Sequence, residues 1–192
     1  MKLPSFLQAS KNELQVQPLP ASAHDLANPL GLLRKNEFVS DRWYRATYSL
    51  DASLKMTADE HYLVVGAKNG FEPNPLFKTR WYYRSYPSVA ESRLNPAIHY
   101  LALGSRNGLK PNPLFDPTWY RKTYPDVGAS GIEPLVHYLK FGSKEGRSPA
   151  PEIFTQWLPK AVDSATGEDA HPLAVYLGLL DRMRVGLAAA KS

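Results

Sequence analysis

Residues 114–151, LFDPTWYRKTYPDVGASGIEPLVHYLKFGSKEGRSPAP, form one copy of a repeat that accounts for most of the chain. Eight residues of this stretch recur at a spacing of 38 in two earlier copies, and neither step needs a gap. The three sets are Trp43, Tyr44, Tyr48, His61, Tyr62, Gly66, Gly70 and Pro75, then Trp81, Tyr82, Tyr86, His99, Tyr100, Gly104, Gly108 and Pro113, then Trp119, Tyr120, Tyr124, His137, Tyr138, Gly142, Gly146 and Pro151. A fixed period of this length predicts an array of one supersecondary unit.

The period also divides the chain. We expect an all-α fold, a short array of about four 38-residue helical-hairpin repeats with atypical terminal caps. The parts are an N-terminal arm with a capping helix, three full repeats, and a degenerate fourth repeat with a C-terminal capping helix. Their boundaries are 1–35, 36–75, 76–113, 114–151 and 152–192.

The first helix of each unit is expected near Ser40, Lys78 or Asp116 and carries the motif W-Y-x-x-x-Y. Asp116, which is followed by proline, is the clearest start, because both residues favour a helix N-terminus. Pro87 and Pro125 follow the motif in the second and third copies. We expect them to end the helix and to open a loop of about eight residues, because proline disfavours helical geometry in the residue before it.

The second helix of each unit opens with a proline, namely Pro96, Pro134 or Pro172, and Asn95 is the best of its N-caps. The glycines at its far end are Gly66, Gly104 and Gly142. We expect Gly104 and Gly142 to be left-handed C-caps, a conformation that glycine adopts without strain. Both helices are short, so stacking against neighbouring units must complete the burial of their apolar faces.

Atypical segments are expected at both ends. Residues 28–35 predict a short capping helix with Asn28 as its N-cap, and residues 1–27 predict an extended arm. In the last unit Leu180 replaces the glycine, so a longer amphipathic helix is expected from Pro172 to about Ala190. Its apolar side would carry Leu173, Tyr176, Leu177, Leu180, Met183 and Leu187.

Four tryptophans recur at the repeat spacing: Trp43, Trp81, Trp119 and Trp157. A buried aromatic side chain contributes up to about 5 kcal/mol by the area it removes from water. We therefore expect this ladder to stabilise the stack, with Trp81 and Trp119 in the core.

The composition excludes several classes of protein. The 192 residues contain no cysteine, which rules out disulfides and thiolate metal sites. The formal net charge is +5, which permits an acidic partner without requiring one. No apolar run is long enough for a membrane span, and no signal peptide is evident. We expect a cytoplasmic protein, or one peripheral to the inner membrane, and we do not expect nucleic acid as a partner.

His61, His99 and His137 occupy one position of the repeat. Equivalent atoms of stacked helices lie roughly 10 Å apart, whereas zinc holds its nitrogens at about 2.1 Å, so the three cannot share a metal. We expect each to be structural and to bond a backbone carbonyl or the next turn. No triad or carboxylate pair stands out, and we expect neither an enzyme nor a cofactor.

Cations recur at a second position: Lys68, Arg106 and Lys144 each stand two residues before a glycine of the turn. We call these three residues the basic row, and Arg84, Arg121 and Lys122 add charge near the aromatic residues of the first helix. A row of cations beside tyrosines could bind an acidic polymer. The alternative is that these side chains are merely solvated.

The third copy, FDPTWYRKTYPDVGASGIEPLVHYLKFGSKEGRSPAP, resembles a tandem repeat of bacterial surface-polysaccharide proteins. That repeat has the form F-D-x-x-W-Y-x-x-x-Y-P-D-V followed by N-P-x-x-H-Y-x-x-x-G-x-x-E-G-R-x-P-x-P, and the resemblance covers about residues 37–151. It often accompanies glycosyltransferase domains, including rhamnan-synthesis-like ones. The resemblance implies an accessory role, because the repeat is not the catalytic part of those proteins.

Two functions are therefore expected from different classes. The first is a non-catalytic scaffold that binds another protein, such as a glycosyltransferase or an envelope component. The second is a carbohydrate-binding module that holds an acidic polysaccharide through ladders of Tyr and Lys or Arg.

Overall fold

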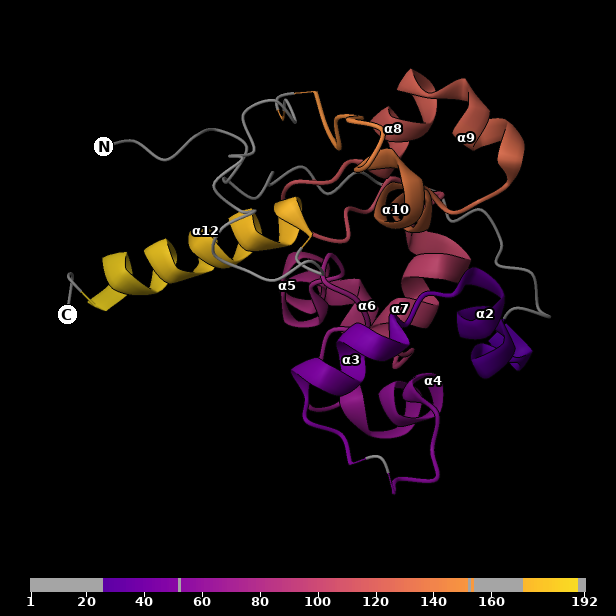
Figure 1. The fold of residues 1–192 in the computed structure, drawn as a ribbon, viewed down its shortest axis with the longest axis vertical. Helices are drawn as coiled ribbons and strands as arrows, with labels where there is room; N and C mark the ends of the chain where they lie inside the picture. Colours follow the sequence, from indigo (N-terminus) through magenta and orange to yellow (C-terminus); the bar gives the residue numbers. More distant parts are fainter. Residues whose placement is uncertain (1–25, 52, 152, 154–170, 190–192) are drawn as a thin grey trace.

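The computed structural model describes residues 26–51, 53–151, 153 and 171–189. These residues form helices joined by turns, and the only β pairing among them is an isolated bridge between Ala150 and Ile153. The prediction of an all-α fold is confirmed for this part of the chain (Figure 1). Residues 1–25 of the arm predicted over residues 1–27, Trp157 and the first helix of the fourth unit lie outside the described residues.

The first helix of each full unit begins where the sequence predicts. These helices are α3 (Asp41–Thr47), α5 (Thr79–Ser85) and α8 (Pro117–Thr123). Their N-caps are Ser40, Lys78 and Asp116. The Asp116 carboxylate accepts a hydrogen bond from the Trp119 N–H at 2.9 Å, which satisfies one of the unpaired donors at a helix start.

The segment after the first helix is not a loop in the second and third units, where the prediction was wrong. Pro87 and Pro125 end the preceding helix, but each is also the first residue of another short helix, α6 (Pro87–Glu91) or α9 (Pro125–Ser130). Proline suits this position because the first helical N–H has no partner to lose. The first unit has Ser49 instead of proline, and it forms no helix there.

The second helix of each unit has two parts. An α-helical part covers α4 (Ala58–His61), α7 (Pro96–His99) or α10 (Pro134–His137). A π-helical part continues it as η2 (Tyr62–Gly66), η3 (Tyr100–Gly104) or η4 (Tyr138–Gly142). The predicted starts at Pro96 and Pro134 are confirmed, and the side chain of Asn95 caps α7.

The glycines that end this helix are not left-handed, so that prediction was wrong. The left-handed glycines come four residues later, at Gly70, Gly108 and Gly146, with φ of 73°, 75° and 71°. Gly66, Gly104 and Gly142 are needed for space. A Cβ at Gly104 would lie 2.1 Å from the hydroxyl of Tyr82, and the equivalent distances to Tyr44 and Tyr120 are 2.1 and 2.0 Å. Glycine therefore lets a tyrosine of the first helix contact the backbone of the second.

Tyrosine, not tryptophan, fills the core. The largest fully buried side chains include Tyr44, Tyr62, Tyr82, Tyr100, Tyr120, Tyr138, Phe38, Phe77 and Phe115. Trp43, Trp81 and Trp119 are only half-buried, which corrects the expectation of a tryptophan core. Each indole instead meets the second tyrosine ring of its W-Y-x-x-x-Y motif edge-on. The centroid distances to Tyr48, Tyr86 and Tyr124 are 6.1–6.3 Å.

The two ends of a unit are held together by buried hydrogen bonds. Asn74 is fully buried; its side-chain N–H donates to the Phe38 carbonyl at 2.9 Å and its oxygen accepts from the Phe77 N–H at 2.8 Å. Asn112 repeats the first bond at 2.8 Å to the Leu76 carbonyl. The third unit has Ala150 at this position and lacks the side-chain bond. This closure fixes where one unit ends and the next begins.

Caps of different kinds flank the units. Helix α2 (Pro29–Asn36) begins at the predicted N-cap, where the Asn28 side chain accepts from the Gly31 N–H. It packs against α4 and α7, beside the three units that follow one another along the long axis (Figure 1). Helix α12 (Pro172–Ala189) confirms the predicted C-terminal helix and buries Leu173 and Leu177.

Candidate functional site

Each of the three full units contains one tyrosine–histidine pair, in which the tyrosine is fully buried and the histidine is buried or half-buried. The hydroxyls of Tyr44, Tyr82 and Tyr120 lie 3.0 Å from Nδ1 of His61, His99 and His137, respectively. The predicted structural role fits this contact, but the partner is a hydroxyl of the first helix and not a backbone carbonyl. Burial lowers the pKa of all three histidines and raises the pKa of all three tyrosines.

The second tyrosine of each W-Y-x-x-x-Y motif, at the C-cap of the first helix, also has a structural partner. The hydroxyls of Tyr48, Tyr86 and Tyr124 accept hydrogen bonds from the backbone N–H groups of Glu72, Lys110 and Ser148, at 2.6, 2.8 and 2.9 Å. These bonds attach the connecting turn to the helix. The six tyrosine hydroxyls of the W-Y-x-x-x-Y motifs are thus used inside the fold, and the expected tyrosine ladder is not an open surface.

No metal site or membrane helix emerges from the described residues. Among them, no group of three or more His, Asp or Glu side chains could hold a metal ion. None of their helices is both long and apolar enough to cross a bilayer.

The basic row lies on the surface, at one turn of each unit. Lys68, Arg106 and Lys144 are exposed, and each is the second residue after a π-helical segment. None of the three side chains forms an ion pair with another described residue. The left-handed glycine two residues later fixes the turn. The repeat therefore presents one cation in the same local geometry three times.

Two arginines from the following unit lie against these turns. Arg80 is exposed and donates from Nη2 to the carbonyl of Asn69, the residue after Lys68, at 3.1 Å. Arg121 donates from Nη2 to the hydroxyl of Ser105, the residue before Arg106, at 3.5 Å. Sequence reasoning missed Arg80 because its repeat signal is incomplete: the first unit has Arg42 at the equivalent position, but the third unit has Thr118.

The other two predicted cations have different surroundings. Arg84 and Lys122 are exposed at equivalent positions of α5 and α8. No contact among the described residues joins either of them to the basic row. The structure thus brings Arg121 to the row and leaves Arg84 and Lys122 on the surface of the first helices.

A polar cluster anchors the second turn from beneath. Glu133, the N-cap of α10, accepts hydrogen bonds from the hydroxyls of Tyr100 and Ser105 at 2.8 and 2.7 Å. Its other oxygen accepts from the Val136 N–H at 3.0 Å. Burial raises the pKa of Glu133, and these hydrogen bonds oppose that change. The turn that carries Arg106 is therefore attached to the third unit.

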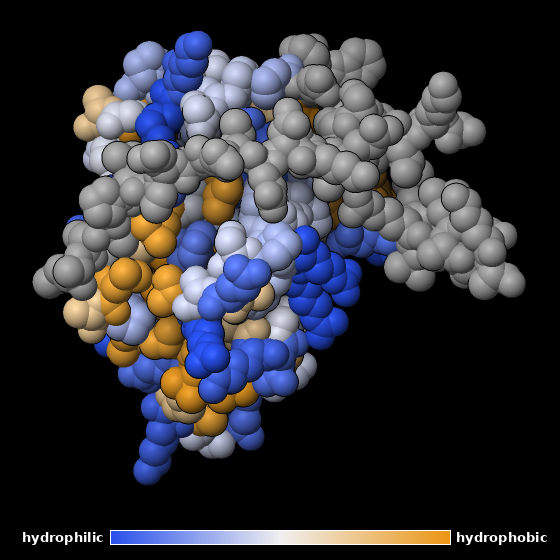
Figure 2. Space-filling view, turned by 180° about the vertical axis from the view of Figure 1, so that it is seen from behind, coloured by the Kyte–Doolittle hydropathy of each residue, from blue (hydrophilic) through white to orange (hydrophobic). Residues whose placement is uncertain are grey.

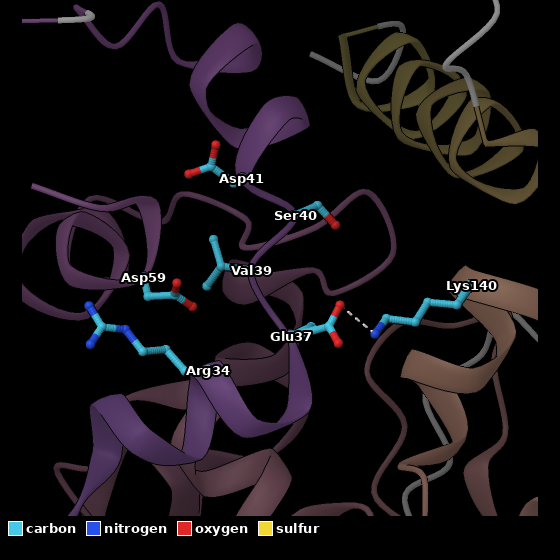
Figure 3. A pocket seen from close by; sticks show the side chains of 7 residues that line it. All are labelled: Arg34, Glu37, Val39, Ser40, Asp41, Asp59 and Lys140. Carbon is cyan, nitrogen blue, oxygen red and sulfur yellow. Dashed lines mark ion pairs between the residues drawn. The ribbon is translucent and has the colours of Figure 1, made fainter.

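The cleft of Figure 3 separates α2 from the first and third units and has a volume of about 390 Å³. It is lined by Arg34, Glu37, Val39, Ser40, Asp41, Asp59 and Lys140. Its charges are largely paired: Lys140 Nζ contacts Glu37 Oε2 at 2.6 Å, and Arg34 contacts Glu60 at 3.0 Å. The Lys140–Glu37 ion pair connects α2 to the third unit across the cleft, and the pairing leaves little charge for a ligand.

Comparison of the chain with models of protein families, with curated proteins and with solved structures found no match.

Proposed function

We propose that the chain is a non-catalytic scaffold that binds an acidic surface of another protein through the basic row. The observation that carries this proposal is the repeated, exposed cation at Lys68, Arg106 and Lys144, which has no ion-pair partner among the described residues. Arg80 and Arg121 add charge at the first two turns. Several cations on one surface raise the association rate with an acidic partner and favour it over a basic one.

The groups that usually carry catalysis support a non-catalytic role. The histidines at the repeat position are bonded to tyrosines of the same unit, and their lowered pKa keeps them neutral near pH 7. Their recurrence in every unit is explained by folding, since each unit must bury the same tyrosine.

A protein suits the row better than a glycan does. Sugar recognition by stacking needs open aromatic faces, and the tyrosines of the ladder are buried or half-buried with their hydroxyls bonded. In the alternative function, binding of an acidic polysaccharide would thus depend on the cations alone. The resemblance to repeats of surface-polysaccharide proteins supports an accessory role in polysaccharide synthesis or envelope assembly, with a glycosyltransferase or an envelope component as partner.

Charge reversal tests the proposal. Lys68→Glu, Arg106→Glu and Lys144→Glu are combined in one variant, and Lys35→Glu, Lys55→Glu and Arg93→Glu in a matched control. Each reversal lowers the net charge by two, so three reversals change it from +5 to −1 in both variants. All six positions are exposed, and such surface changes usually alter stability by less than about 0.5 kcal/mol each.

Both variants and the wild type are then used to capture partners from the native cell. We expect a partner that the wild type and the control retain, that the row variant loses, and that dissociates as salt rises. Equal capture by the row variant and the wild type would refute the proposal. A row-dependent signal on acidic glycans, with no row-dependent protein, would favour the carbohydrate-binding alternative.

A further inference from the structure

An apolar residue precedes each cation of the basic row by three positions. These residues are Val65, Leu103 and Phe141, and together with Lys68, Arg106 and Lys144 we call them the mixed face. Val65 and Phe141 are 38% and 45% exposed, far more than the core side chains. Leu103 is half-buried and packs against the core. The apolar position is thus open to solvent at the first and third units.

The apolar and cationic members of a unit share one side of the helix. The backbone stays right-handed helical beyond the π-helical segment, with Ala67 at φ −60° and ψ −39°. In the third unit the Lys144 N–H donates to the Phe141 carbonyl at 2.9 Å, so these residues lie on successive turns. Residues three apart are neighbours on a helix surface. Figure 2 shows apolar side chains next to strongly polar ones on the face of the molecule that it presents.

We propose that the mixed face binds an acidic amphipathic helix of the partner protein, an inference that rests on the proposed function. The cations lack partners among the described residues, so charge complementarity selects an acidic ligand. The exposed Val65 and Phe141 select a ligand that also offers apolar side chains. A helix presents a continuous apolar stripe flanked by charge, which can contact anchors in different units without exact register.

The same observations argue against a purely polar acidic ligand. Such a chain could pair with Lys68, Arg106 and Lys144 but would bury no apolar surface against Val65 and Phe141. Its binding would therefore depend on charge alone. In that case the arrangement of apolar residues in a ligand would not change its affinity.

The test uses two labelled synthetic peptides of about 20 residues, a length that favours a helix. Both contain the same leucines and glutamates. One places leucines at i, i+3, i+4 and i+7 along one face, and the other distributes them around the helix. Binding to the full chain is followed by fluorescence anisotropy. We expect the amphipathic peptide to bind about tenfold more tightly than the scattered one.

Two protein variants complete the experiment. Val65→Ser with Phe141→Ser should abolish the preference for the amphipathic peptide, whereas Leu54→Ser with Ile132→Ser should preserve it. The control residues are exposed apolar side chains outside the mixed face, at 36% and 38% exposure. Circular dichroism verifies that each variant keeps its helical content.

The outcomes separate this inference from the proposed function. Equal affinity for the two peptides, or an unchanged preference in the Val65→Ser, Phe141→Ser variant, would overturn the inference. The proposed function would still stand if the charge-reversed row had lost its native partner. If reversal of the row affects neither the native partner nor the peptides, both proposals are wrong.

Discussion

The first and third units build the same framework but cover one tyrosine ring differently. In the first unit, the Phe71 ring stacks on Tyr48 with centroids 3.9 Å apart and planes 3° from parallel. In the third unit, the guanidinium of Arg147 takes the equivalent place, 4.8 Å from the Tyr124 centroid. The position over this ring is half-buried in both units, so it accepts different side chains that can lie over the ring.

The largest effect tests the framework that both units share. Tyr44→Ala and Tyr120→Ala should each lower the free energy of unfolding by about 3–5 kcal/mol, because each empties a fully buried position. Urea denaturation measures both. Matched Tyr44→Phe and Tyr120→Phe variants, which lose only the hydroxyl bond to histidine, should cost about 1 kcal/mol. A large loss in one unit and almost none in the other would show that the units are not equivalent.

The framework could be predicted because it depends on local rules. Proline at the first helical position and the Asn28, Asn95 and Asp116 caps fix the helix starts, and each acts within three residues. The 38-residue period then implies that each unit is built alike. The long helix after Pro172 followed from the loss of a glycine at Leu180.

Several features could not be predicted because they depend on contacts between elements. Whether Gly104 is a left-handed cap or a point of close approach depends on Tyr82, which lies on another helix. The repeat shows that Trp119 and Tyr120 both recur, but not which of them points inward. The basic row could be placed on exposed turns from its spacing, whereas the approach of Arg80 to the first turn is seen only in its contact with Asn69.

Acid should weaken the third unit more than the first. Burial lowers the pKa of His61 in the first unit and of His137 in the third. The third unit also contacts His171, whose ring lies 5.5 Å from that of Tyr138 and whose pKa burial lowers to about 4. Below pH 6.5 these histidines bind fewer protons in the folded protein than in the unfolded chain. Their contribution to the free energy of unfolding is therefore fully present above pH 6.5 and is lost as pH falls. For His171 the loss by pH 4 is about 3 kcal/mol.

Urea titrations between pH 7.5 and 4 check this prediction. His171→Phe keeps an aromatic ring beside Tyr138 and should flatten the pH dependence. Burial raises the pKa of Glu72 and Glu133, whose contribution has the opposite sign because it is present below pH 4.5 and lost at higher pH. If the free energy of unfolding of His171→Phe depends on pH as that of the wild type does, burial of His171 does not cause the loss of stability in acid.

The close approach of tyrosine to glycine should be equally tight in both units. Gly66→Ala and Gly142→Ala each place a Cβ about 2 Å from a tyrosine hydroxyl, and overpacking of this kind costs about 1–3 kcal/mol. Removing the hydroxyl with Tyr44→Phe or Tyr120→Phe should recover part of the loss, because the next ring atom lies more than 3 Å away. Thermal unfolding of each single and double variant measures the coupling; strictly additive losses would contradict it.

The smallest effect separates the two units. Arg147 is ion-paired with Asp126 at 2.9 Å and with Glu145 at 2.6 Å, and the side chains of these acids are 57% and 47% exposed. Exposed pairs of this kind contribute little, so Arg147→Phe should change stability by less than about 1 kcal/mol. The new ring can lie on Tyr124 as Phe71 lies on Tyr48, which offsets the lost pairs.

The reverse exchange in the first unit should not be neutral. Phe71→Arg would find Leu50 and Asn69 where the third unit has Asp126 and Glu145, so the guanidinium would gain no acid and the stacked ring would be lost. We expect a loss of about 1 kcal/mol, and partial recovery when Leu50→Asp and Asn69→Glu are added. Equal costs for Phe71→Arg and Arg147→Phe would mean that the ring, and not its acidic neighbours, decides which side chain covers the tyrosine.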